Sequence, residues 1–325
     1  MTIEPANMKA IYYSEFGSVD VLEIGERPIP QPGPNQVLVK VAAAGVNPID
    51  RRLRNGELQD FFQREWPIIP GWDVSGKIVK LGSEVSDWQI DQDIVGLAFT
   101  WVLQHGSYAQ YIVIDDSSIA PLPPELDYIQ GAALPLVSLT AWQALDEFAH
   151  LGQGQSVLIQ AGAGGVGSVA IAMAKHLGAK VYTTTRSKNF DYVKARGADH
   201  PIDYTQANYI EVIRQHQPGG LDVVLESLTG DELVKDAIRL VKDGGSVPFL
   251  NNEPPEMKEI ETRKINTTFI HHRPDGKMLQ ELMQKFADGT FMLPAILSMP
   301  LVEARSAQIQ SESMTTNGKM VLTVS

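Results

Sequence analysis

The sequence SVLIQAGAGGVGSVAIAMAKHLGAKVYTTTR, residues 156–186, contains the clearest structural pattern of the chain. It opens with a short apolar run, continues with glycines at positions 162, 164 and 167, and ends in a β-branched run at 180–185. Between the two runs, apolar residues recur every three or four positions, which is typical of one face of an α-helix. Gly178 suits the left-handed conformation that often ends a helix. The stretch therefore predicts a strand, a glycine turn, a helix and a second strand.

The three glycines follow the G-x-G-x-x-G spacing, between a predicted strand and a predicted helix. In that context glycine lets the backbone approach a pyrophosphate, and the start of the helix offers unpaired N–H groups to the anion. A glycine-rich turn without a ligand is the alternative interpretation. We predict a dinucleotide site whose loop residues are Gly162, Ala163, Gly164, Gly165, Val166 and Gly167.

The end of the second strand indicates which dinucleotide is bound. NAD-selective sites usually place Asp or Glu there, to bind the ribose 2′-hydroxyl. In this chain Thr184 and Thr185 are followed by Arg186 and Lys188, and the next carboxylate is Asp191. A guanidinium binds a 2′-phosphate through paired, charged hydrogen bonds. We therefore predict NADPH as the cofactor, held by Thr184, Arg186 and Lys188. A solvated loop is the alternative for the two basic residues.

The chain has 325 residues, a net charge of −12 and no cysteine. The acidic charge disfavours nucleic acid as a partner, because phosphate binding needs a basic surface. No apolar run approaches the ~20 residues that span a bilayer, and no signal peptide opens the chain, so we expect no membrane association. Without thiols, and without a histidine spacing typical of metal ligands, we predict no metal site and a cytoplasmic protein.

The remaining sequence predicts an α/β fold in two domains. Short β-branched runs separated by Pro, Gly and Asp dominate the first ~120 residues, which indicates a small barrel or irregular sheet. From residue 156, predicted strands alternate with helices, as in a doubly wound parallel sheet. The six strands are expected at 156–161, 180–185, 200–203, 221–226, 245–250 and 267–271. A last helix (276–288) and strand (320–324) have no place in that sheet. The predicted domains are therefore 1–124, an inserted 125–268, and 269–325 as a return to the first domain.

Several short motifs add a family resemblance when their order and spacing are taken together. The motifs are A-G-V-N-P-I-D from Ala44, P-G-W-D-V-S-G from Pro70, G-S-Y-A-Q-Y from Gly106, L-T-A-W-Q-A-L from Leu139, the glycine loop, and G-K-M-V-L from Gly318. With them the chain resembles the zinc-free quinone oxidoreductase branch of the medium-chain dehydrogenase/reductase superfamily over nearly its whole length. The resemblance implies a GroES-like β-rich catalytic domain with an inserted Rossmann domain, usually assembled as a homodimer.

The resemblance also implies an NADPH-dependent, zinc-independent reductase that transfers hydride to a small quinone or an activated alkene such as an enone. Without zinc, hydrogen bonds must polarise the acceptor oxygen. A non-catalytic NADPH-binding redox sensor or structural protein is the alternative, whereas the missing cysteines disfavour an alcohol dehydrogenase. An acceptor pocket around Asn47 and the side chains of Phe61, Phe62 and Trp66 would favour catalysis.

The resemblance places Asn47 near the nicotinamide and the acceptor, where its amide can donate to a developing oxyanion. A turn before Pro48 is the alternative role for Asn47. For Asp50, capping of a helix competes with a role in the site. Arg52 stands where similar proteins commonly carry tyrosine. It either lies on a solvated face or reaches the acceptor, and in the second case it would favour an anionic or carbonyl-rich substrate.

The remaining predicted cofactor contacts lie outside the glycine loop. The resemblance places Thr140 at the start of a helix that faces the nicotinamide, as an N-cap or as a ligand contact. The resemblance places Tyr204 beside the adenine ribose or the 2′-phosphate, with a buried core position as the alternative. Further contacts are expected at strand ends, where open α/β sheets bind ligands, and from the C-terminus, where Lys319 is expected to reach the cofactor phosphate. These contacts are Ser227, Leu250, Asn251 and Lys319. No role is predicted for Glu226.

Overall fold

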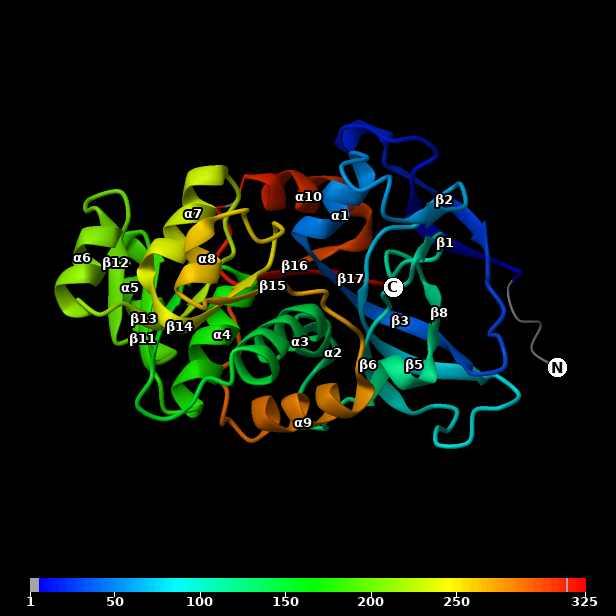
Figure 1. Ribbon diagram of the computed structural model, residues 1–325. Helices are drawn as coiled ribbons and strands as arrows, with labels where there is room; N and C mark the ends of the chain where they lie inside the picture. Colours follow the sequence, from blue (N-terminus) through cyan, green and yellow to red (C-terminus); the bar gives the residue numbers. More distant parts are fainter. Residues whose placement is uncertain (1–5, 314) are drawn as a thin grey trace. The chain divides into compact units, whose positions relative to one another are not determined.

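The computed structural model describes residues 6–313 and 315–325. The chain forms two compact units, whose elements are labelled in Figure 1. The first unit comprises Met1–Leu136, Arg273–Asp288 and Ala295–Ser325, and the second comprises Val137–His272 and Gly289–Pro294. Each helix in the described part of the chain is too short or too polar to cross a bilayer.

The first unit is built on a seven-stranded sheet with the order β16-β17-β3-β5-β6-β9, in which β8 also pairs with β3. The C-terminal strand β17 runs antiparallel to β3, with Met320 opposite Val46 and Thr323 opposite Ala43. This pairing brings the end of the chain beside the A-G-V-N motif. The strands are β3 (Gln36–Val46), β5 (Asp73–Leu81), β6 (Asp93–Leu97), β8 (Tyr111–Asp115), β9 (Ile119–Pro121), β16 (Ile296–Pro300) and β17 (Lys319–Thr323).

Smaller elements complete the first unit. Two further strand pairs are β1 (Asn7–Tyr12) with β2 (Glu23–Pro28), and β4 (Gln63–Arg64) with β7 (Val102–Leu103). The helices are α1 (Pro48–Arg54), α2 (Tyr128–Ala132), α9 (Gly276–Ala287) and α10 (Ala304–Glu312), with 3₁₀ turns at Val19–Val21, Asp116–Ser118 and Leu301–Glu303. Because α2 packs against β3 and β5, this unit extends beyond residue 124, where the sequence predicted a boundary.

The second unit contains the predicted doubly wound sheet. Its strand order is β12-β11-β10-β13-β14-β15, and all five neighbouring pairs are parallel. The strands are β10 (Ser156–Ile159), β11 (Lys180–Thr185), β12 (His200–Asp203), β13 (Leu221–Leu225), β14 (Val241–Phe249) and β15 (Asn266–Phe269). The order reverses between β10 and β13, and in such sheets ligands bind outside the carboxyl ends of the strands at this point. The α/β class and the six parallel strands confirm the prediction.

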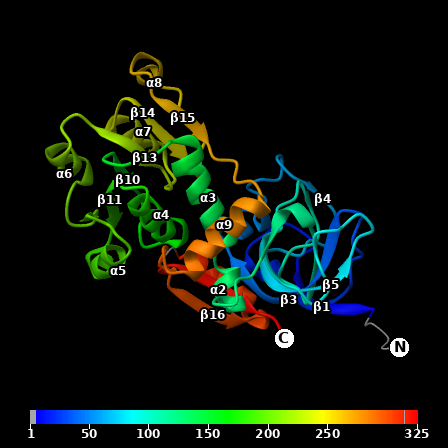
Figure 2. The same cartoon turned by 90° about the horizontal axis from the view of Figure 1, so that it is seen from below.

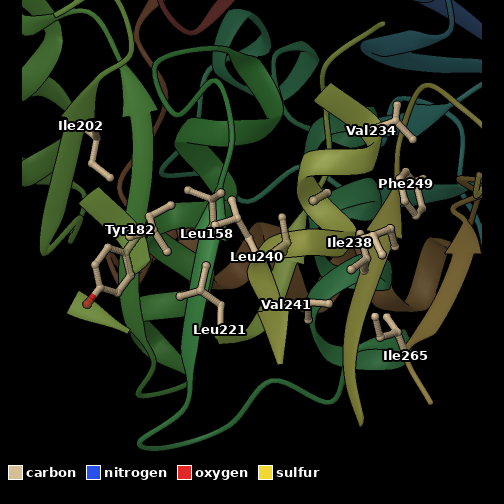
Figure 3. Packing of buried hydrophobic residues seen from close by; sticks show 14 residues of the cluster. Leu158, Tyr182, Ile202, Leu221, Val234, Ile238, Leu240, Val241, Phe249 and Ile265 are labelled. Atoms are coloured by element: carbon tan, nitrogen blue, oxygen red, sulfur yellow. The ribbon is translucent and has the colours of Figure 1, made fainter. Parts of the chain in front are cut away.

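Helices cover both faces of this sheet (Figure 2). On one face, α6 and α7 share a buried cluster with sheet side chains such as Leu158, Tyr182 and Phe249 (Figure 3). On the other face, α4 packs against β10 and β11. The helices are α3 (Pro135–Trp142), which continues as a π-helical segment (Gln143–Phe148), α4 (Gly165–His176), α5 (Phe190–Ala195) after a 3₁₀ turn (Ser187–Asn189), α6 (Tyr209–His216), α7 (Asp231–Leu240) and α8 (Lys258–Thr262).

The segment Gly289–Pro294 returns to the second unit late in the sequence. Its Phe291 is buried, at 1% exposure. The ring packs edge-on against His176 at a centroid distance of 5.4 Å and also approaches Trp142. A residue far along the chain therefore completes part of the core of the second unit.

Candidate functional site

The turn between β10 and α4 needs glycine at two of its three motif positions for reasons internal to the fold. A Cβ on Gly162 would lie 1.9 Å from Thr183 Oγ1, and one on Gly167 would lie 2.4 Å from the carbonyl oxygen of Ala161. Ala161 itself adopts a positive φ of 50°. The first and third glycines therefore allow the turn to pack tightly between strand and helix.

Gly164, the N-cap of α4, is not required by the fold in the same way, since its φ of −77° is one that any residue can adopt. A Cβ there would come no closer than 3.3 Å to a protein atom, the carbonyl oxygen of Ala161. As an N-cap without a side chain, Gly164 gives the helix no capping hydrogen bond. The first N–H groups of α4 therefore stay open to an outside acceptor. Ala163, Gly165 and Val166 line the same turn. This arrangement fits a pyrophosphate.

The end of β11 combines a structural threonine with two exposed cations. Thr184 is buried, and its Oγ1 accepts a hydrogen bond from the backbone N–H of Ala161 at 3.1 Å, so it supports the glycine turn. Arg186 and Lys188 are exposed. Neither side chain has an ion-pair partner among residues 6–313 and 315–325, which leaves both charges available to an anion.

A carboxylate that the sequence analysis did not consider lies beside this strand end. Asp203 pairs with Thr185 across β11 and β12. It accepts hydrogen bonds from the backbone N–H of Ser187 at 2.6 Å and from the Ser187 hydroxyl, and also from the N–H and hydroxyl of Thr205 at 2.9 and 2.6 Å. These donors hold the pKa of Asp203 well below its usual range. The rule that carboxyl ends of parallel strands meet at one edge could have predicted this neighbour.

Tyr204, the next residue, is 50% exposed, so the alternative of a buried core tyrosine does not hold. Thr140 also differs from its predicted position. It lies inside α3 rather than at its start, so it is not an N-cap. Its hydroxyl is buried, and no hydrogen-bond partner is found for it in the part of the chain that the structure describes. An unpaired buried hydroxyl is free to contact a ligand.

The loops after β13 and β14 are tied to the end of β10. The Ser227 hydroxyl donates to the carbonyl oxygen of Gln160 at 3.1 Å. Asn251 Nδ2 donates to the carbonyl oxygen of Ser227 at 2.7 Å, and the N–H of Leu250 donates to that of Glu226 at 3.0 Å. The predicted cofactor contacts Ser227, Leu250 and Asn251 therefore belong to one ordered edge, at the point where the strand order reverses.

Glu226 is fully buried at this edge. Its carboxylate accepts a hydrogen bond from the N–H of Leu228 at 2.8 Å and a long one from Asn252 Nδ2. Burial nevertheless disfavours the ionised form and raises the pKa of Glu226 to about 7. The residue for which the sequence suggested no role thus shapes the loop that follows β13.

In the first unit, Asn47 begins α1 and is only 2% exposed. Its Oδ1 accepts a hydrogen bond from Lys319 Nζ, and its Nδ2 donates to Asp73 Oδ2 at 2.8 Å. Lys319 Nζ also lies 3.1 Å from Asp73 Oδ2. Gly45 makes room for this cluster, because a Cβ there would lie 2.7 Å from Asp73 Cβ. The amide of Asn47 is therefore held by two charged neighbours.

Lys319 was expected to contact a cofactor phosphate, and the structure gives this side chain other partners. It is 3% exposed, and its Nζ also donates to the carbonyl oxygen of Val46 at 3.2 Å. An ammonium has three N–H donors, and Val46, Asn47 and Asp73 supply one acceptor each. Lys319 therefore belongs to the buried cluster around Asn47 and not to a phosphate site.

Asp50 caps α1. Its Oδ2 accepts hydrogen bonds from the backbone N–H of Asn47 and from the Tyr108 hydroxyl, both at 2.9 Å. Burial raises the pKa of Asp50 to about 7. The side chain also lines a small cavity with Leu53 and Trp72. Capping is therefore established by the geometry, and a role in the site remains a prediction.

The three arginines of α1 each have an acidic partner. Arg51 and Arg52 lie 3.4 and 3.3 Å from the carboxylate of Glu57, and Arg54 lies 2.6 Å from that of Glu312. Because Arg52 is already paired with Glu57, which it shares with Arg51, the geometry supports the solvated-face alternative for Arg52. It gives no support to an anionic acceptor.

The predicted aromatic group separates into two clusters. Phe62 packs with Trp101 at a ring distance of 5.5 Å and also contacts Trp72 and Phe99. Trp66 packs instead against Tyr13 and Phe16. Phe61 is 70% exposed. The sequence did not single out Trp72 and Phe99 as members of the first cluster. Trp72 immediately precedes Asp73, the first residue of β5, whose carboxylate accepts a hydrogen bond from Asn47.

The matches to known families and proteins agree with these features. Residues 33–124 match the family described as "Alcohol dehydrogenase GroES-like domain", and residues 165–274 match "Zinc-binding dehydrogenase". Mouse (Mus musculus) quinone oxidoreductase is 32% identical over 97% of this chain and 97% of its own. The "NADPH-dependent alkenal/one oxidoreductase, chloroplastic" of Arabidopsis thaliana is 34% identical over 79% of this chain and 67% of its own.

Among solved structures, the quinone oxidoreductase from Coxiella burnetii is similar to this chain with a TM-score of 0.88 and 31% identity, covering 98% of this chain and 100% of that one. Its fold and the two family matches confirm the resemblance predicted from the sequence motifs. The protein is therefore an oxidoreductase, and it belongs to the quinone oxidoreductase branch of the medium-chain dehydrogenase/reductase superfamily.

Proposed function

We propose that this protein is an NADPH-dependent, zinc-independent reductase of quinones or enones. The observation that carries the proposal is the open start of α4 at Gly164 together with the basic end of β11. The names of the relatives support the two acceptor classes, since one is a quinone oxidoreductase and another an alkenal/one oxidoreductase. Among these relatives, the second is named as NADPH-dependent.

The second unit supplies the groups for the cofactor. The N–H groups at the start of α4 would bind the pyrophosphate, with the macrodipole of this 12-residue helix favouring the negative charge. Arg186 and Lys188 would bind the 2′-phosphate, and Tyr204 would lie beside the adenine ribose. The Thr140 hydroxyl and the edge formed by Ser227, Leu250 and Asn251 would contact the nicotinamide half.

The first unit supplies the group for the acceptor. Bound NADPH would provide the hydride for the quinone or the enone β-carbon. The Asn47 Nδ2 group would then donate a hydrogen bond to the oxygen on which negative charge develops, and that oxygen would take a proton from solvent or from a nearby donor. An amide can do this without a change in its own protonation.

Zinc independence is proposed although one matching family is described as zinc-binding. The chain has no cysteine, so no thiolate ligand set can form. Residues 6–313 and 315–325 also contain no group of three His, Asp or Glu side chains suited to a metal. Homodimerisation and a cytoplasmic location remain predictions, from the resemblance and from the cysteine-free composition.

The test is NADPH oxidation at 340 nm with a panel of quinones and enones, with and without a metal chelator. We expect turnover of at least one class, unchanged by the chelator. The control is the same panel with NADH, which we expect to be the poorer donor. Tight NADPH binding without turnover of any acceptor would contradict the proposal and favour a redox sensor, and loss of activity with the chelator would contradict zinc independence.

A further inference from the structure

We propose that Lys319 is a positioning residue which, with Asp73, fixes the Asn47 amide so that an N–H group, and not the carbonyl oxygen, is presented to the acceptor. The inference rests on the proposed function, because it deepens the donor role given there to Asn47. It also assigns a role to a buried lysine that already contacts three acceptors within the protein.

The geometry joins three side chains from three separate segments. Asn47 follows β3, Asp73 begins β5, and Lys319 begins β17. Their exposures are 2%, 0% and 3%. Lys319 Nζ contacts both Asn47 Oδ1 and Asp73 Oδ2, while Asp73 Oδ2 also accepts from Asn47 Nδ2. Each member of the cluster therefore touches the other two.

The chemistry of the two charged neighbours allows only one orientation of the amide. Lys319 can only donate, so the Asn47 atom facing it must be the carbonyl oxygen. An ionised Asp73 can only accept, so the atom facing it must be the amide nitrogen. A flipped amide would place N–H groups against the ammonium and an oxygen against the carboxylate. The flip is therefore penalised at both ends.

In this orientation one N–H group of Asn47 Nδ2 remains for the acceptor. Nδ2 carries two N–H bonds, and one of them is used by Asp73. No other protein acceptor for Nδ2 is found among residues 6–313 and 315–325. Hydrogen bonds in a low-dielectric network polarise one another, so the ammonium on Oδ1 also makes the remaining N–H a stronger donor. The second carboxylate oxygen of Asp73 accepts from the N–H of Leu136 at 2.7 Å, which holds Asp73 itself in place.

The orientation can be tested without cofactor or substrate. In protein labelled with ¹⁵N-asparagine, the side-chain amide signal of Asn47 is assigned by its loss in Asn47→Ala. We expect this signal to move or broaden in Lys319→Gln. The matched control is Val321→Ala, a truncation of a fully buried residue on the same strand, in which we expect the signal to stay in place. An unchanged signal in Lys319→Gln would overturn the proposal.

A double-mutant cycle, measured by steady-state kinetics, then tests whether Lys319 acts through Asn47. We expect Lys319→Gln to lower kcat about tenfold when Asn47 is present, which is less than the roughly hundredfold loss that follows removal of an oxyanion donor itself. In the Asn47→Ala background the same change should cost less than about twofold, because interacting residues are non-additive. NADPH affinity should stay within about twofold. Equal losses in both backgrounds, or a large loss of NADPH affinity, would contradict the inference.

A variant that lacks both charges controls for a loss of stability in Lys319→Gln. Lys319→Gln alone leaves Asp73 buried without its cation, which is destabilising. Lys319→Gln combined with Asp73→Asn removes both charges, and we expect it to reproduce the loss in kcat and the change in the Asn47 signal. If wild-type protein reduced no acceptor, the proposed function would fail, whereas the NMR comparison would still decide whether Lys319 orients the amide.

Discussion

Asp203 uses both carboxylate oxygens on Ser187 and Thr205, and this limits what the end of β11 can offer a cofactor. The Ser187 N–H and hydroxyl are already engaged. A phosphate at this strand end would therefore meet the charges of Arg186 and Lys188 rather than the hydrogen-bond donors of Ser187. Selectivity between NADPH and NADH should depend on these two exposed cations.

We expect Arg186→Ala to weaken NADPH binding roughly tenfold to a hundredfold, since a hydrogen bond to a charged group contributes about 1.5–3 kcal/mol. NADH affinity should change less than about twofold, because NADH lacks the 2′-phosphate. Calorimetry with both coenzymes measures the difference. Arg214→Ala is the matched control, because Arg214 is an exposed arginine on α6 of the same unit. Equal losses for NADPH and NADH would show that Arg186 does not hold the phosphate.

Glu226 predicts a pH dependence of stability. Burial raises its folded-state pKa from 4.5 to about 7, so the folded protein binds a proton that the unfolded chain releases between those values. The contribution of Glu226 to stability is therefore fully present below about pH 4.5 and is lost as the pH rises toward 7, by up to about 1.4 kcal/mol per pH unit.

Urea unfolding of wild-type protein and Glu226→Gln at pH 5, 6, 7 and 8 checks this sign. Glutamine keeps an oxygen that can accept from the N–H of Leu228 but has no proton to lose. We expect the free energy of unfolding of wild type, relative to that of the variant, to fall from pH 5 to 7 and to level off above it. A relative stability of wild type that rises over this interval would mean that Glu226 is ionised in the folded protein.

At the level of elements, the three glycines of the turn before α4 have two different roles: two allow the turn to pack, and one leaves space at the start of the helix. A Cβ on Gly162 or Gly167 would collide with Thr183 or Ala161, whereas Gly164 has an ordinary φ and a Cβ there would come no closer than 3.3 Å to a protein atom. The spacing of the motif predicted the turn and the helix. It could not separate these roles, because the distinction depends on how closely each glycine approaches Thr183 of β11 or the carbonyl oxygen of Ala161 in the folded turn.

Two substitutions separate the roles. We expect Gly164→Ala to leave the Tm nearly unchanged and to weaken NADPH binding about tenfold or more, because its methyl group would occupy space at the start of α4; overpacking of this kind costs about 1–3 kcal/mol. Gly162→Ala should instead lower the Tm, because its Cβ would collide with Thr183 Oγ1. Thermal unfolding and calorimetry of both variants measure these effects. Unchanged NADPH affinity in Gly164→Ala would place the pyrophosphate elsewhere.

The elements that the sequence did not predict are those with weak patterns. All six strands of the parallel sheet were found from their apolar runs, although β14 begins at Val241 rather than at 245 because it continues directly from α7. In contrast, β16 has no fully buried residue, and α10 buries only three residues. Neither carries the strong periodicity from which a strand or helix is recognised.

For the whole molecule, the α/β class and the family followed from local patterns, whereas the cluster around Asn47 did not. Lys319 and Asn47 lie 272 positions apart, and only the pairing of β17 with β3 brings them together. Without that pairing, a lysine near the C-terminus looks like any other basic residue. The position of Asp203 beside the end of β11 could have been predicted from the parallel sheet, but its hydrogen bonds with Ser187 depend on the register between β11 and β12.

The late return of Gly289–Pro294 has a consequence for dissecting this protein. The chain crosses between the units four times, so neither unit corresponds to one continuous gene fragment. A recombinant piece ending at His272 would lack Phe291 and leave a gap against Trp142 and His176. An autonomous nucleotide-binding fragment would need this six-residue peptide grafted back, for example through a short flexible linker.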